Sequence, residues 1–165
     1  MKTLIHIAKS ALIVACLFLA SCSKDSSSSS SNNNPTPSGS NYFKLNGTLI
    51  TLDSVDVTVY DNATGGRYID VYGFKGTNQV LELHMPAAVG NYPAQHAGFT
   101  SANSWLTYQT GGTESDDYFH SDSGAMNVTT FNESGQRLVG TFEFVGNNGT
   151  TTKNITEGHL DLSAF

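Results

Sequence analysis

The sequence predicts an all-β domain, an antiparallel β-sandwich or flattened barrel built as a meander of about eight or nine short strands. Runs of β-branched and aromatic residues alternate with polar residues at a period of two. Turn-forming pairs such as Asn46-Gly47 and Asn148-Gly149 recur between these runs. Because no stretch of the domain shows a sustained period of 3.6, we expect almost no helix. A closed, lipocalin-like barrel is the alternative architecture.

The first three strands are predicted from a hairpin signal and an alternating run. Asn46-Gly47 separates residues 42–45 from residues 48–52, and such a pair is typical of a two-residue hairpin turn. Residues 54–60 then place three valines on one face and polar side chains on the other. This alternation predicts a strand with one face against the core.

The fourth and fifth strands differ in which faces are apolar. Residues 67–74 carry apolar or aromatic side chains on both faces, which predicts a central strand or one covered on its outer side. Residues 79–85 alternate, so that the leucines and Met85 point inward while Glu82 and His84 point outward.

The second half of the domain is predicted to hold four further strands. Residues 104–108 form a short one that carries the single tryptophan, Trp105. Residues 124–131, 137–145 and 154–162 each place large apolar side chains on alternate positions. Strands that repeat at this spacing, with turn residues between them, favour a meander.

The N-terminus predicts export and lipid attachment. Residues 1–21 combine a short basic start with an apolar run at 11–20, which is too short to span a bilayer and is typical of a signal peptide. The sequence Leu19-Ala20-Ser21-Cys22 resembles a bacterial lipobox. The resemblance implies cleavage between Ser21 and Cys22, lipidation of Cys22, and a membrane partner reached through the lipid anchor.

Residues 22–41 and 42–165 are predicted to behave as a tether and a folded domain. Serine, asparagine and proline dominate 22–41, which therefore cannot bury a core and should be disordered. The domain at 42–165 holds five basic and 13 acidic residues, a net charge of −8. This charge argues against nucleic acid as a partner, and the length allows one core.

The two ends of the domain carry a family resemblance. Residues 43–47, Gly90-Asn91-Tyr92-Pro93, residues 140–144 and residues 154–162 together resemble a family of small Bacteroidota lipoproteins of unknown function. The resemblance implies the all-β fold and residence in the outer membrane, and it brings no catalytic residues. Cys22-Ser23-Lys24-Asp25 is similar to the mature start of such lipoproteins, which leaves display on the cell surface open.

Candidate metal ligands are few in the sequence. An acidic loop is a weak calcium candidate through four carboxylates, and a solvated loop is the favoured alternative. These are Glu114, Asp116, Asp117 and Asp122. The domain's histidines follow no metal-binding motif, and we interpret them as surface or cross-strand residues. They are His84, His96, His120 and His159. No cofactor is expected.

Four aromatic residues in the polar middle of the domain are candidates for ligand binding. Trp105, Tyr108, Tyr118 and Phe119 lie near the acidic loop, where aromatic rings beside carboxylates are typical of sugar sites in β-sandwiches. Packing beneath a long loop is the alternative. Asp53-Ser54-Val55 resembles an acceptor for O-glycosylation at Ser54 in exported Bacteroidota proteins.

Taken together, these patterns favour a non-catalytic envelope lipoprotein. We expect it to bind a glycan or an envelope protein through residues 96–122. A purely structural envelope module is the first alternative, and a small hydrolase is the second. The chain lacks the Gly-x-Ser-x-Gly motif, and its only Ser-x-x-Lys sequence, Ser21 to Lys24, straddles the predicted cleavage site, so we do not expect an enzyme.

Overall fold

The structure is a computed structural model that describes residues 41–63, 65–96 and 104–165. The predicted signal peptide, Cys22 and the tether up to residue 40 lie outside the described residues. Residues 97–103 of the predicted binding segment also lie outside them.

The described part is almost entirely β-strand, which confirms the predicted fold class. The only helical element there is one 3₁₀ turn, η1 (Ser115–Asp117). The strands are β1 (Tyr42–Leu45), β2 (Thr48–Thr51), β3 (Ser54–Asp61), β4 (Arg67–Lys75), β5 (Asn78–Pro86), β6 (Gly90–Pro93), β7 (Trp105–Gln109), β8 (Tyr118–Asn132), β9 (Arg137–Asn147) and β10 (Thr152–Leu162).

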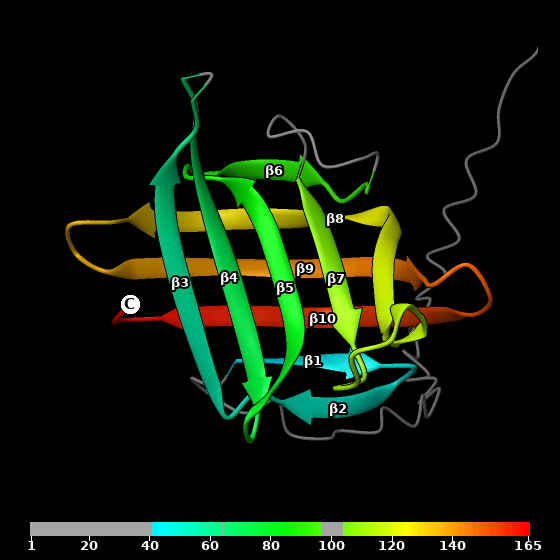
Figure 1. The fold of residues 1–165 in the computed structure, drawn as a ribbon. Helices are drawn as coiled ribbons and strands as arrows, with labels where there is room; N and C mark the ends of the chain where they lie inside the picture. Colours follow the sequence, from blue (N-terminus) through cyan, green and yellow to red (C-terminus); the bar gives the residue numbers. More distant parts are fainter. Residues whose placement is uncertain (1–40, 64, 97–103) are drawn as a thin grey trace, which may run out of the picture. The chain divides into compact units, whose positions relative to one another are not determined.

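All strand pairs are antiparallel and form one sheet in the order β2-β1-β10-β9-β8-β7-β5-β4-β3, with β6 added on β8. The sheet curls on itself, so that β3, β4, β5 and β7 cross over β8, β9, β10, β1 and β2 (Figure 1). Because the path of paired strands begins at β2 and ends at β3, the described strands form an open half-barrel. The flattened-barrel prediction therefore holds, and the closed barrel does not.

Strand β8 carries the chain from one layer to the other. Its first residues pair with β7, and Ala125–Val128 pairs with β6. Gly124 lies between these parts with φ +142, and a Cβ there would lie 2.2 Å from the carbonyl oxygen of Glu143. Only glycine fits such a position, and so Gly124 allows β8 to bend.

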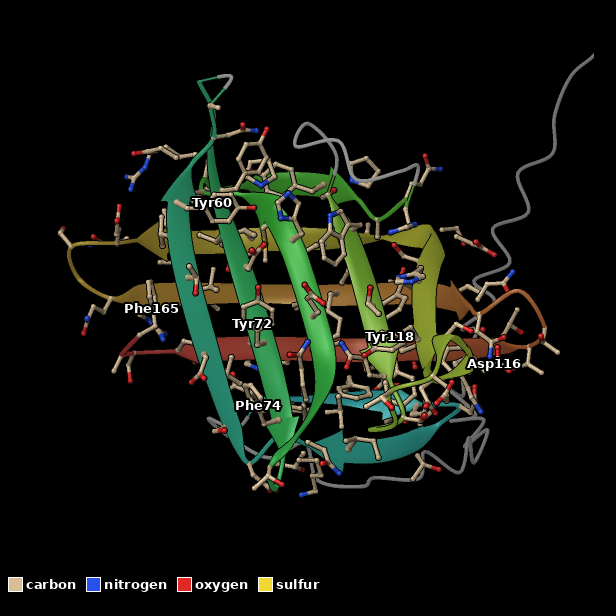
Figure 2. All side chains as sticks on the ribbon, in the orientation of Figure 1. Tyr60, Tyr72, Phe74, Asp116, Tyr118 and Phe165 are labelled. Carbon is tan, nitrogen blue, oxygen red and sulfur yellow. The ribbon has the colours of Figure 1, made fainter. Side chains whose placement is uncertain are left out.

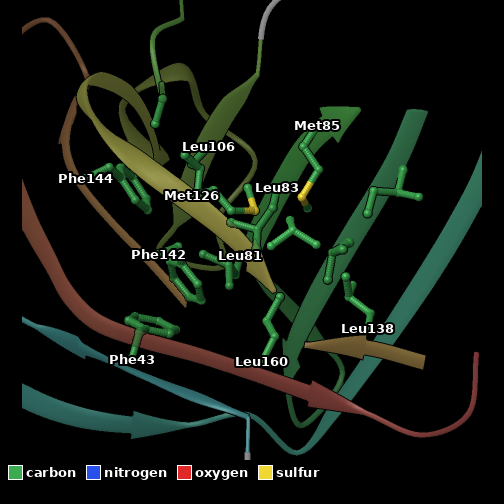
Figure 3. Packing of buried hydrophobic residues seen from close by; sticks show 14 of the residues in the cluster. Phe43, Leu81, Leu83, Met85, Leu106, Met126, Leu138, Phe142, Phe144 and Leu160 are labelled. Carbon is green, nitrogen blue, oxygen red and sulfur yellow. The ribbon is translucent and has the colours of Figure 1, made fainter. Parts of the chain in front are cut away.

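The interior between the layers is filled by apolar side chains. Leu81, Leu83 and Met85 of β5 are fully buried, as their alternation predicts. They meet Phe43, Phe142 and other large side chains from the opposite layer (Figure 3). A core packed in this way leaves the outer faces of the two layers as the surfaces available for function.

Two predicted boundaries differ from the structure. Gly90–Pro93, predicted as a turn, is strand β6. Strand β8 begins at Tyr118 rather than at 124, so it takes in the end of the predicted acidic loop. In both places pairing with a neighbouring strand supplies hydrogen bonds that local sequence does not encode.

Candidate functional site

The outer face of β3, β4, β5, β7 and β8 is the first candidate surface, because the register of the strands brings polar and aromatic side chains into rows across it. Asp70, His84 and Trp105 lie directly opposite one another on β4, β5 and β7. Tyr72, Glu82 and further polar residues form the next row. Neighbouring residues in such rows are close enough to contact each other. Figure 2 shows Tyr60, Tyr72 and Tyr118 on this layer.

A chain of stacked and edge-on rings crosses this face, and we call it the ring ladder. Its members, in spatial order, are Tyr60, Tyr68, His84, Trp105, His96, His120 and Tyr118. The shortest step, between His96 and His120, has ring centroids 4.3 Å apart, and the longest, between His120 and Tyr118, has them 6.4 Å apart. Spacings of this size allow favourable aromatic contacts along the whole ladder.

His84 occupies the middle of the ring ladder. Its ring is stacked between Tyr68 and Trp105, each with a centroid 5.2 Å away. Its Nδ1 atom lies 2.7 Å from Oδ1 of Asp70 and 3.1 Å from the hydroxyl of Tyr60. His84 therefore points outward as predicted, but its neighbours cover it and leave 5% exposed.

Asp70 and Glu82 supply two carboxylates beside the ladder. Burial and the nearby charge of Asp70 raise the pKa of Glu82. Burial, with the charges of Asp70 and Glu82, raises the pKa of Tyr72 to about 12. The Tyr72 hydroxyl donates to Oδ2 of Asp70 at 3.3 Å.

The ladder ends in an open pocket of about 440 Å³, which we call the end pocket. It is lined by His96, Ser115, Tyr118, His120, Asp122, Asn147, Asn148 and Gly149. Three rings of the ladder line this pocket: His96, His120 and the last ring, Tyr118. The volume falls within the range of roughly 300–1,000 Å³ that is usual for ligand pockets.

Hydrogen bonds fix the polar groups of the end pocket. The Asn147 side-chain amide donates to Oδ2 of Asp122 at 2.8 Å, and the Asn148 amide donates to the backbone oxygen of Asp116 at 2.8 Å. The Thr107 hydroxyl lies 3.0 Å from Nδ1 of His120. Burial, and then the neighbouring His96, lower the pKa of His120, which favours its neutral form.

The four predicted binding aromatics separate onto two sides of the sheet. Trp105 and Tyr118 belong to the ring ladder, whereas Tyr108 and Phe119 point into the interior. The ring of Tyr108 lies 6.0 Å from the rings of both Phe43 and Phe119. Residues that follow one another along a strand point to opposite faces, so these sequence neighbours could not share one surface.

Three of the four calcium candidates, Glu114, Asp116 and Asp117, lie at η1, and Asp122 lies on β8. Asp117 is held at η1, where it accepts from the Thr110 hydroxyl and, at 3.1 Å, from the Glu114 backbone N–H. Asp122 instead bonds to Asn147. Across residues 41–63, 65–96 and 104–165, no three His, Cys, Asp or Glu side chains are grouped to share a metal ion.

Sequence reasoning missed Tyr60, Tyr68, Asp70 and the central role of His84. One signal was available, because residues 67–74 are aromatic on their outer face as well as apolar on their inner face. Ser54, the predicted glycosylation site, is exposed at the start of β3. Its modification stays a prediction.

Comparison with known proteins gives no relative: no family model, no curated protein and no solved structure matches the chain. Within the described residues, none of the helical structure has the length and apolarity needed to cross a membrane.

Proposed function

We propose that this chain is a lipid-anchored lipoprotein of the bacterial outer membrane whose β-domain binds saccharide without catalysis, in the end pocket. The observation that carries the proposal is the pocket's combination of a terminal ring, Tyr118, with the carboxylate of Asp122 and the amide of Asn147. This combination agrees with the expectation of glycan binding through residues 96–122.

The chemistry of a sugar suits these groups. A pyranose presents C–H bonds on its flat faces, which pack against an aromatic ring, and hydroxyls at its edge, which bond to planar polar groups. His120 stacks on Tyr118 with an interplanar angle of 17° and lines the same pocket. Since Asp122 and Asn147 are already bonded to each other, their remaining lone pairs and N–H group are held in fixed directions.

Binding is favoured over hydrolysis by the position of the best acid–base candidate. His84 has a carboxylate partner, as a general base would, but its ring faces are covered by Tyr68 and Trp105. Its side chain is only 6% exposed, so a substrate would have little access to it.

Lipid anchoring is supported by the lipobox residues Ser21 and Cys22. The variant Cys22→Ser should move the protein from the membrane fraction to the soluble fraction of cells, because no thiol remains to be acylated. Fractionation followed by immunoblotting measures this. Retention of the variant in membranes would argue against the anchor.

Saccharide binding is tested with the full chain in detergent micelles on an array of bacterial and plant glycans. Tyr118→Ala should weaken binding of the best array ligand at least tenfold, because it removes the terminal ring. Tyr72→Ala is the matched control, since it removes an equally half-buried tyrosine from the same face outside the pocket. No binding by the unaltered chain, or equal losses in both variants, would refute the proposal.

A further inference from the structure

The outer face of the opposite layer carries a second groove, formed by β6, β8, β9, β10 and β1. The register places five side chains in one row across these strands. In order they are Asn91, Asn127, Thr141, His159 and Tyr42. The row lines a groove of about 460 Å³, which is as large as the end pocket.

An irregularity in β10 produces the hollow. The pairing of β10 with β9 shifts between Ile155 and Gly158, and Glu157 within this bulge has φ +50. Gly158, which follows Glu157, lies over the core: a Cβ there would lie 2.5 Å from the buried ring of Phe142. Bulges that hold a non-glycine residue in the left-handed region are uncommon and concentrate at functional sites.

The groove differs from the end pocket in the state of its polar groups. Among the described residues, the side chains of Asn91, Asn127, Thr141 and Glu143 form no hydrogen bonds to other residues. Nδ1 of His159 is buried and has no partner in the described structure. A buried nitrogen without a partner is unfavourable unless a ligand or water reaches it.

One wall of the groove is a pair of rings. His159 stacks on Tyr42 with centroids 5.4 Å apart and an interplanar angle of 12°. Glu143 and Glu157 supply carboxylates, and Lys44 lies 2.8 Å from Glu157 and is engaged there. The groove therefore offers rings, amides and acceptors to a ligand but no unpaired positive charge among the described residues.

We propose that this groove is a second saccharide site, selective for uncharged sugars. The ring of His159 packs against a sugar face, the amides of Asn91 and Asn127 bond to hydroxyls, and His159 Nδ1 gains a partner. Uronic acids are disfavoured because their carboxylates would approach Glu143 and Glu157. The site lies on the other layer from the end pocket and does not depend on it.

The test uses the full chain in detergent micelles with Tyr118→Ala in place, so that the end pocket is already impaired. Isothermal titration calorimetry is run with cellohexaose, xylohexaose, mannohexaose and chitohexaose, and with hexagalacturonic acid as the acidic probe. We expect at least one neutral hexaose to bind with a stoichiometry of one, at least tenfold more tightly than the acidic probe. Absence of binding by all neutral probes, or preference for the acidic one, would overturn the proposal.

Adding Thr141→Trp to the Tyr118→Ala protein should reduce its affinity for the neutral hexaose at least tenfold. The reason is that the indole fills the groove from an exposed strand position. Thr58→Trp is the control, since Thr58 is an exposed strand residue outside both cavities. Asn127→Ala, a smaller change at an exposed position, should weaken binding by severalfold and guards against a folding defect in Thr141→Trp. Unchanged binding in both groove variants would place the ligand elsewhere.

Discussion

The outer faces of the two layers differ in how their polar side chains are bonded. On the outer face of β3, β4, β5, β7 and β8, which we call the ladder face, rings stack on rings and polar side chains bond to each other. His84 bonds in this way to Asp70, and Asn147 to Asp122. On the outer face of β6, β8, β9, β10 and β1, which we call the groove face, a bulge at Glu157 opens a groove. The amides of this groove have no partners within the described structure. Both faces belong to one continuous sheet.

This difference separates side chains that stabilise the fold from side chains that are available to bind a ligand. Side chains that satisfy one another are ordered by folding itself, so they present a rigid surface but have fewer free groups for a ligand. Unsatisfied side chains contribute little to folding but keep their hydrogen-bonding capacity for a ligand. We therefore expect mutations in the ring ladder to affect stability most, and mutations in the groove to affect binding most.

The largest effect is expected from His84→Ala, which breaks the ladder at its centre. Loss of two ring contacts, at about 0.5–1.5 kcal/mol each, and of the partner of Asp70 should destabilise the domain by about 2–4 kcal/mol. Urea unfolding followed by tryptophan fluorescence measures this. His159→Ala is the control from the other face. It removes one ring contact, with Tyr42, and no hydrogen bond at Nδ1, so we expect a smaller loss of about 0.5–1.5 kcal/mol. Equal losses of stability in the two variants would show that the ladder does not stabilise the domain more than the groove does.

The next effect is expected from Gly158→Ala, which overpacks the core beneath the groove. The added Cβ would overlap the ring of Phe142, and overpacking of this kind typically destabilises by about 1–3 kcal/mol. The same change in a Phe142→Leu background should be less harmful, because the smaller side chain leaves room for it. A double-mutant cycle measures this coupling, and additive effects would show that Phe142 does not limit position 158.

The fold was predictable because alternation and turn pairs are local signals. Leu81, Leu83 and Met85 point inward as their period of two requires, and Asn46-Gly47 forms the β1–β2 turn. The antiparallel meander follows from such hairpins.

The candidate sites were only partly predictable, because each depends on the register between strands distant in sequence. Trp105 and Tyr118 were found from composition near the acidic loop, but their link through His96 and His120 arises from strand pairing. The groove depends on the bulge at Glu157, and nothing in the local sequence marks that shift. A one-residue change of register would turn each of these side chains to the other face.

The smallest effect expected is a pH dependence of the domain's stability that arises at His120 on the ladder face. Burial and His96 lower the pKa of His120 in the folded protein, so the unfolded chain binds a proton there more readily. Stability should therefore fall as the pH is lowered from about 7.5 to about 5.5, through the ordinary histidine range and before most carboxylates titrate. Thermal unfolding across this window measures the slope. His120→Gln should flatten this slope. Parallel curves for the native chain and His120→Gln would show that His120 is not its source.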